Sequence, residues 1–127
     1  MLPDRDRTAL LDMLAHAEEA VKLAEGHERG DLDRNRVLCL AVQHLIAIVG
    51  EAAGRVSQET RATYSRIRWR PFIRMRNRFI HGYDTVRPRQ VWDTVTLDLP
   101  ALIYELKAAL APEPRAGDKD ADDPPSV

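Results

Sequence analysis

Apolar residues recur along most of the chain at the three- and four-residue intervals of a helix. No segment alternates with the two-residue period of a half-buried strand. The first apolar stripe joins residues 10, 14, 17, 21 and 24. It predicts a helix over 5–25, whose start Asp4 or Asp6 can cap and whose end Gly26 can form.

A second helix is predicted over 32–56, with Asp31 in position to cap its start. Between residues 37 and 49 it is apolar on nearly every face. Such a helix is either central in a bundle or covered by a second subunit. Cys39 and His44 lie in this stretch, and we interpret them as packed core side chains rather than ligands.

Proline and glycine mark the ends of two further helices. Pro71 suits the first position and Gly82 the C′ position of a short helix over 71–81. Pro88 opens a last helix over 88–111, in which Pro100 removes one backbone hydrogen bond and predicts a kink. The expected fold is therefore an all-α antiparallel bundle of four main helices.

The chain of 127 residues is expected to form one helical domain over 1–111 and a disordered acidic, proline-rich tail over 112–127. A single cysteine excludes an intrachain disulfide. No apolar export segment opens the chain, and the longest uncharged run, of 14 residues, falls short of the about 20 that span a membrane. We therefore expect a cytoplasmic protein without a membrane partner.

Charge is distributed unevenly, although the net charge is only −1. From Arg55 to Gln90 there are ten arginines, no lysine and two acidic residues. Guanidinium groups bind phosphate through two hydrogen bonds and stack on flat rings. The segment therefore predicts an anionic partner, with nucleic acid as the first candidate and Arg70, Arg74 and Arg78 as candidate RNA contacts. An acidic protein surface and internal ion pairs are the alternatives.

Of the four histidines, only His81 lies among potential catalytic partners. Asn77 precedes it by four residues, so the amide can share a helix face with the imidazole and orient it. Arg76 is about 140° around the helix from His81, so one helix does not aim both side chains at one phosphate. The alternative is that His81 only caps the helix and that Tyr83 only packs after the turn.

Arg, Asn, His and Tyr side chains suit RNA cleavage by the RNA's own 2′-hydroxyl, without a metal or cofactor. A base removes the 2′-OH proton, an acid protonates the leaving 5′-oxygen, and arginines stabilise the charge on phosphorus. This chemistry needs two proton-transfer groups, and each chain offers one good candidate, His81. A symmetric homodimer would supply two at a shared interface.

The segment MRNRFIHGYD, residues 75–84, resembles the R-x4-H-x-Y signature of HepT-like toxins of the HEPN superfamily. Residues 48–57 resemble the family's Gly-Glu-Ala segment, and residues 91–100 its final helix, so the resemblance covers roughly 11–110. It implies an all-α homodimer with a composite cleft and metal-independent endoribonuclease activity. It also implies a toxin–antitoxin pair with an MNT-type nucleotidyltransferase as the antitoxin.

By this resemblance, Arg76 and His81 match the catalytic pair, and Asn77 matches the polar residue beside the arginine. Tyr83 matches the tyrosine that the nucleotidyltransferase can modify with AMP. Glu51 matches the carboxylate of the Gly-Glu-Ala segment, and we expect it near the site as an orienting partner.

The sequence departs from the family pattern just before this motif. It reads Ile-Arg-Trp over 67–69, where the family has Ile-Pro-Trp, and Arg74 replaces a small residue. Both changes add positive charge beside the site, so they concern substrate preference more than activity.

Three functions are compatible with these residues. The first is a dimeric ribonuclease toxin acting on tRNA or mRNA. The second is a non-catalytic helical subunit that binds a nucleotidyltransferase, and the third is a plain RNA-binding bundle. The RNA target and the stoichiometry with an antitoxin stay open.

Overall fold

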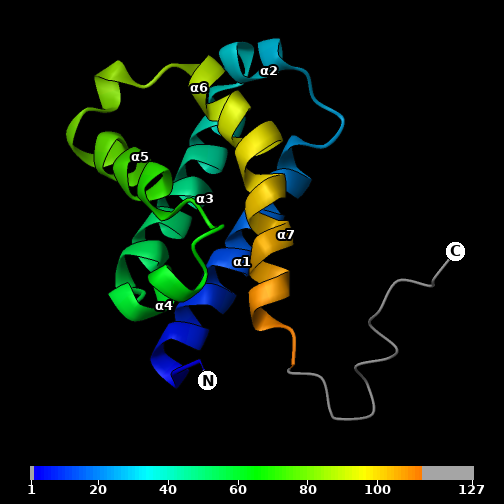
Figure 1. Ribbon diagram of the computed structural model, residues 1–127. Coiled ribbons are helices and arrows are strands. Elements are labelled where there is room, and N and C mark those ends of the chain that lie inside the picture. Colours follow the sequence, from blue (N-terminus) through cyan, green and yellow to red (C-terminus); the bar gives the residue numbers. More distant parts are fainter. Residues whose placement is uncertain (1, 113–127) are drawn as a thin grey trace, which may run out of the picture.

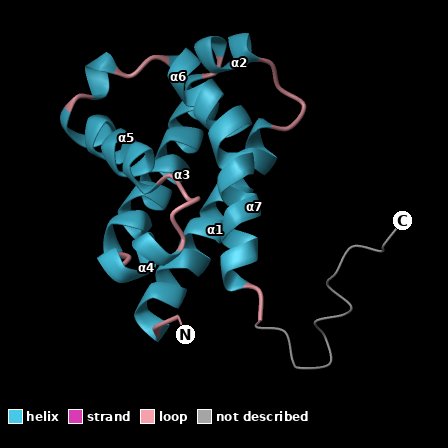
Figure 2. Cartoon of the chain, in the orientation of Figure 1, coloured by secondary structure: helices cyan, strands magenta, loops and turns pink. Residues whose placement is uncertain are grey.

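The computed structural model describes residues 2–112, and this part of the chain is built from helices and turns without strands (Figures 1 and 2). The elements are α1 (Asp4–Ala24), α2 (Arg29–Arg34), α3 (Arg36–Arg55), α4 (Gln58–Thr63), α5 (Trp69–His81), the 3-10 turn η1 (Tyr83–Thr85), α6 (Pro88–Asp93), the π-helical turn η2 (Thr94–Asp98) and α7 (Leu99–Leu110). The all-α prediction is confirmed. The predicted tail falls, from residue 113 on, outside the described residues.

Four long units form the bundle: α1, α3, α5 and the joined α6–η2–α7. Successive units run in opposite directions, and α1 and α3 lie between α5 and α7 (Figure 1). The predicted stripe of the first helix is confirmed at residues 10, 17 and 24, whereas residues 14 and 21 are only partly buried and Met13 enters the core instead. The largest fully buried side chains are Leu10, Met13, Val42, Ile46, Val49, Val91, Val95, Leu99 and Leu106.

The predicted second helix is broken at Asn35, so its prediction as one element over 32–56 is wrong. Asn35 has an extended backbone, and its Oδ1 accepts a hydrogen bond from the Leu38 N–H at 3.0 Å. An asparagine side chain that caps the following turn competes with helix continuation. Asp31 consequently belongs to the short α2, where its carboxylate accepts from the Glu28 N–H at 2.8 Å.

The start of α1 is also different from its prediction, because neither aspartate caps it; Pro3 occupies the cap position. Asp6 is instead buried, and its carboxylate accepts hydrogen bonds from the Ser57 N–H (2.9 Å), the Ser57 hydroxyl (2.7 Å) and the Thr60 hydroxyl (2.6 Å). The Thr60 hydroxyl, followed by the two Ser57 donors, holds the pKa of Asp6 below its usual value. These bonds fasten α1 to the start of α4. Gly26, with φ of 77°, ends α1 as predicted.

One long face of α3 is not covered by the other residues that the structure describes. Val37 is 79% exposed and Leu40 45% exposed. His44 is also exposed, so its interpretation as a core residue is wrong, whereas Cys39 is buried as predicted. Within residues 2–112, α3 is the one helix long and apolar enough to cross a membrane, and half of its most apolar stretch is buried in the bundle. A core helix with one uncovered face has this composition.

The short helix α5 begins at Trp69, two residues before its prediction, which places Pro71 at the third helical position. Proline is tolerated there because the first N–H groups of a helix have no intrahelical acceptor. The predicted kink in the last helix is confirmed. It takes the form of the π-helical turn η2, which ends two residues before Pro100.

Candidate functional site

The helices α3 and α5 touch backbone to backbone at Gly50. A Cβ atom at this position would lie 2.3 Å from the Phe72 carbonyl oxygen and 2.6 Å from the Arg76 Cβ. Only a residue without a side chain permits this approach. Gly50, the glycine of the Gly-Glu-Ala segment, therefore fixes the position of Arg76 relative to α3. It also brings Glu51, the next residue of α3, close to the same crossing.

Arg76 is half-buried beside this crossing, and its Nη1 donates to the Asn77 Oδ1 at 3.2 Å. Within the described part of the chain, the Asn77 amide contacts this guanidinium and makes no hydrogen bond to His81. The role of Asn77 in orienting the imidazole stays a prediction. Glu51 is exposed, and among residues 2–112 no hydrogen bond or ion pair ties its carboxylate to another group. Its orienting role stays a prediction.

His81 is the last residue of α5, and its side chain is exposed. Gly82 follows with φ of −140°, so the helix ends at His81 as predicted, but Gly82 takes the C-cap position rather than the predicted C′ position. The chain instead turns directly into η1, because the Thr85 N–H donates to the Gly82 carbonyl at 2.9 Å. Tyr83 opens η1 and is 75% exposed. A large reagent can therefore reach its hydroxyl, two residues from His81.

The three arginines predicted to contact RNA differ in their surroundings. Arg78 donates through Nη2 to the Thr85 carbonyl at 2.9 Å and lies 3.4 Å from the Gln90 Oε1. It therefore holds the loop after α5 against the helix. Arg70 and Arg74 are exposed and make no ion pair within the described residues.

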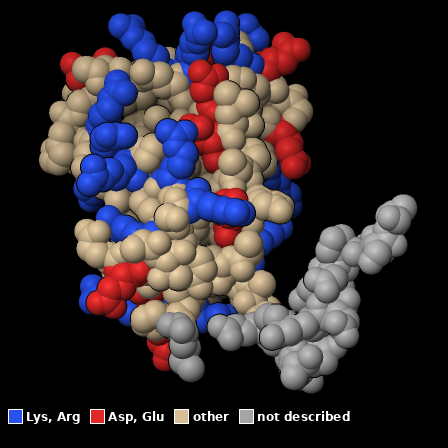
Figure 3. Space-filling view, in the orientation of Figure 1, with Lys and Arg blue, Asp and Glu red and all other residues tan. Residues whose placement is uncertain are grey.

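Internal ion pairs do not account for the arginine-rich segment. Of its ten arginines, only Arg55 forms an ion pair in the described structure, with Asp12 at 3.0 Å. Arg61 caps the end of α3 by donating to the Ala53 and Gly54 carbonyls, each at 3.1 Å. The space-filling view shows Lys and Arg side chains gathered over α5 and the segment before it (Figure 3). Among residues 2–112, acidic side chains therefore leave most of this charge without an ion pair.

Four polar side chains form a row along the exposed face of α5, which we call the arginine track. The R-x4-H-x-Y motif alone did not reveal it. Arg70, Arg74, Asn77 and His81 follow at intervals of four, three and four residues, so they share one helix face. A strand of phosphates lying along this face would be led to His81. The spacing was present in the sequence, but which face is exposed depends on how α3 covers α5.

Groups of three or more His, Cys, Asp and Glu side chains that could hold a metal ion are absent from the described residues. What the site offers is a half-buried guanidinium, an exposed imidazole, an exposed phenol and an arginine track. These groups can bind a phosphodiester, transfer a proton and stabilise negative charge.

Comparison with known proteins places these residues in context. The sequence model of the family described as Ribonuclease HepT-like matches residues 13–109. "Probable ribonuclease HepT" of Thermococcus cleftensis is 33% identical over 96 residues, covering 72% of this chain and 86% of that protein. A "Putative RNase" of Caldanaerobacter subterraneus subsp. tengcongensis is 29% identical over 107 residues, covering 84% and 96%. Another, of Methanocaldococcus jannaschii, is 26% identical over 107 residues, covering 84% and 88%. No solved structure gives a significant match.

Proposed function

The chain belongs to the HepT-like ribonuclease family, and from that premise we propose that it is a metal-independent endoribonuclease and the toxin of a type II toxin–antitoxin pair. The observation that carries this proposal is the track of exposed arginines on α5, which form no ion pair within residues 2–112 and lead to the exposed His81 with Arg76 close by. Arginines are sufficient for RNA binding alone. An exposed imidazole at the end of the track adds a group that can transfer a proton, which cleavage requires.

In the proposed reaction, the imidazole of one His81 removes the proton from a 2′-hydroxyl. The 2′-oxygen bonds to phosphorus, the bond from phosphorus to the 5′-oxygen breaks, and a second His81, as imidazolium, protonates that leaving oxygen. Arg76 neutralises the charge that builds on the phosphoryl oxygens. The products are a 2′,3′-cyclic phosphate and a 5′-hydroxyl, and the two histidines have exchanged protonation states.

A homodimer is proposed because this reaction uses two histidines and each chain supplies one at the right place. The uncovered apolar side chains support the same arrangement. Ile80, directly before His81, is 48% exposed, and the exposed stretch of α3 that contains Val37 and Leu40 offers further apolar area. Burying Ile80 against a second copy would bring two His81 side chains into one cleft.

Regulation is proposed to act through Tyr83, with an MNT-type nucleotidyltransferase as the antitoxin. AMP on the Tyr83 hydroxyl would place a negatively charged phosphate and a bulky nucleoside beside His81, where the RNA phosphate has to bind. The exposure of Tyr83 supports this. Incubation with the nucleotidyltransferase and ATP should raise the intact mass by one AMP and abolish cleavage. After the same incubation, the Tyr83→Phe protein should show no increase in mass and should still cleave RNA.

The experiment that tests the activity is cleavage of labelled tRNA and mRNA in EDTA, with the intact mass checked for bound AMP. Wild type and the control His27→Ala, which removes an exposed histidine far along the chain, should cleave. His81→Ala and Arg76→Ala should be folded and inactive. An unmodified wild-type protein that leaves all RNA intact but binds a nucleotidyltransferase tightly would instead be the non-catalytic subunit.

A further inference from the structure

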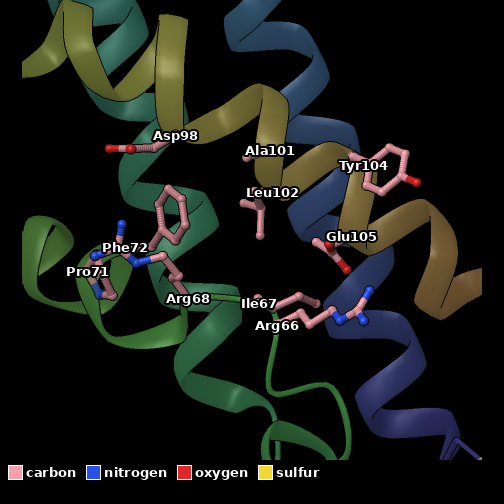
Figure 4. A pocket seen from close by; sticks show the side chains of 10 residues that line it. All are labelled: Arg66, Ile67, Arg68, Pro71, Phe72, Asp98, Ala101, Leu102, Tyr104 and Glu105. Atoms are coloured by element: carbon pink, nitrogen blue, oxygen red, sulfur yellow. The ribbon is translucent and has the colours of Figure 1, made fainter.

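A cavity of about 280 Å³ opens between the start of α5 and the outer side of α7. Phe72, Ile67 and Leu102 form its apolar floor (Figure 4). Tyr104, with 73% of its surface exposed, stands at one side. The proposed cleavage reaction uses none of these side chains, because Arg76 and His81 lie farther along α5.

The rim of the cavity carries two charges of each sign. Arg68 and Asp98 lie on one side, and Arg66 and Glu105 on the other (Figure 4). None of the four forms an ion pair within the described residues. Desolvation raises the pKa of Asp98, an effect that the nearby Arg68 guanidinium partly offsets and the Asp93 carboxylate reinforces. Asp98 is also the last residue of the π-helical turn η2, a distortion that often accompanies a functional site.

The cavity lies at the beginning of the arginine track. Pro71, part of the cavity wall, is next to Arg70, the first residue of the track. At a rise of about 1.5 Å per residue, the ten residues from Pro71 to His81 extend about 15 Å along α5. An RNA strand that follows the track to His81 would therefore pass the cavity within a few nucleotides of the bond to be cleaved.

We propose that this cavity receives one unpaired base of the RNA substrate, whose backbone phosphates lie along Arg70 and Arg74. The inference rests on the proposed RNA-cleaving function and adds a subsite to it. The base would lie on the apolar floor, and its polar edge would meet the rim. The Tyr104 ring points outward in Figure 4, and because it is exposed it can turn over the base as a stacking partner.

The balance of charges at the rim favours a base over other ligands. A free phosphate would be attracted by two guanidinium groups and repelled by two carboxylates of the same rim. An apolar helix would desolvate all four charges without replacing their hydrogen bonds to water. A base offers acceptors to guanidinium groups and amino or imino donors to carboxylates on one flat ring. Stacking on an aromatic side chain is the general way in which proteins hold unpaired bases.

The test measures binding of a fluorescent single-stranded oligoribonucleotide to the His81→Ala protein. In a series of oligonucleotides, one base-free nucleotide is moved along the strand. Ala101→Trp, added to His81→Ala, fills the cavity from an exposed position on α7. Ala62→Trp, at an exposed position on α4, is the matched control. Tyr104→Ala removes the stacking partner and provides a second variant that leaves the core intact.

One position of the strand should be sensitive to base removal, with binding weakened about five-fold to 100-fold, the range expected for one stacked base. Ala101→Trp and Tyr104→Ala should weaken binding of the intact strand and make that position insensitive, because both changes remove the same interaction. Ala62→Trp should leave the profile unchanged. In wild-type protein, the sensitive base should lie at a constant offset from the cleaved bond.

An identical profile in the cavity variants and in the control would overturn the proposal. Loss of nucleotidyltransferase binding in Ala101→Trp, with an unchanged RNA profile, would also overturn it and assign the cavity to the protein partner. The two proposals fail separately. Absence of cleavage by wild type contradicts the ribonuclease function, whereas cleavage without a base-sensitive position linked to the cavity contradicts only the subsite.

Discussion

Gly50 and Arg76 lie in direct contact where α3 crosses α5, so that a methyl group on Gly50 would come within 2.6 Å of the Arg76 Cβ. The contact connects the Gly-Glu-Ala segment with the R-x4-H-x-Y motif in space. The glycine acts through geometry, since it lets α5 lie close enough for Arg76 to be half-buried and held by Asn77. Gly50 therefore helps to position the proposed catalytic arginine by allowing the two helices to approach closely.

Replacing Gly50 with alanine should separate the two helices. The new methyl group would meet the Phe72 carbonyl oxygen, which is backbone and cannot rotate away. We expect a loss of about 1–3 kcal/mol in the free energy of unfolding, as for other overpacked cores. RNA cleavage should fall as well, because Arg76 moves with α5. Urea denaturation and the cleavage assay measure the two effects.

Gly54→Ala is the matched control on the same helix. Apart from the neighbouring backbone of α3 itself, no atom of the described residues lies within 4 Å of a Cβ at that position. Alanine should therefore stabilise the protein by up to about 1 kcal/mol through its higher helix propensity. Equal stability changes in the two variants would show that the crossing at Gly50 is looser than described.

The buried Asp6 carboxylate should make stability depend on pH. Its folded-state pKa is lowered, first by the Thr60 hydroxyl and then by Ser57. Its contribution is therefore fully present above the unfolded-state pKa of about 3.9 and is lost as the pH falls through the lower folded-state value. Asp6→Asn should cost about 1–3 kcal/mol at pH 7.

Thermal unfolding of wild type and Asp6→Asn between pH 7 and pH 3 checks this dependence. The difference between the two proteins should shrink below about pH 4, while the exposed Asp4→Asn should follow wild type throughout. A difference that stays constant down to pH 3 would mean that Asp6 contributes by shape rather than by charge.

A charge at Ile80 should disrupt the proposed dimer. We expect Ile80→Glu to be folded, monomeric by light scattering and inactive on RNA, because a desolvated carboxylate opposes association. The control is Leu11→Glu. Leu11 is similarly exposed and shares its helix face with Glu18, which pairs with Lys107 of α7, away from α5. A dimeric, active Ile80→Glu protein would place the interface elsewhere.

The arginine track predicts how RNA binding responds to salt. The log of the affinity falls as the log of the salt concentration rises. On the His81→Ala background, Arg70→Ala and Arg74→Ala should each make this slope less steep by about 0.7, the value for one phosphate contact on a single strand. The exposed Arg7→Ala on α1 should leave the slope unchanged. Unchanged slopes in all three variants would mean that RNA does not follow α5.

The sequence predicts the ends of the four long helices to within a few residues, apart from the break at Asn35. Apolar spacing marks the first and second helices, and proline and glycine mark the ends of the third helix and the start of the last. Pro100 likewise predicts the bend in the last helix, since a ring without an N–H cannot fit a regular α-helix. The break at Asn35 is harder to foresee, because capping by a side chain competes with helix continuation by a small energy difference.

The features that the hydrophobic pattern did not predict depend on contacts between residues far apart in the sequence. Asp6 has the position of a helix cap, and only the approach of Ser57 and Thr60, some fifty residues later, makes it a buried acceptor. His44 looks like a core residue because its neighbours are apolar, yet it lies on the face of α3 that no helix covers. The cavity beside Tyr104 likewise depends on how α5 and α7 are spaced.

Cleavage by the RNA's own 2′-hydroxyl is tested most directly by comparing two oligoribonucleotides in EDTA. They differ only in a single 2′-deoxy sugar at the cleaved position. We expect unmodified wild-type protein to cut the all-ribose strand, leaving a 2′,3′-cyclic phosphate, and to leave the deoxy-substituted strand intact at that bond. Cleavage of the deoxy-substituted bond, or products with a 5′-phosphate, would contradict this mechanism.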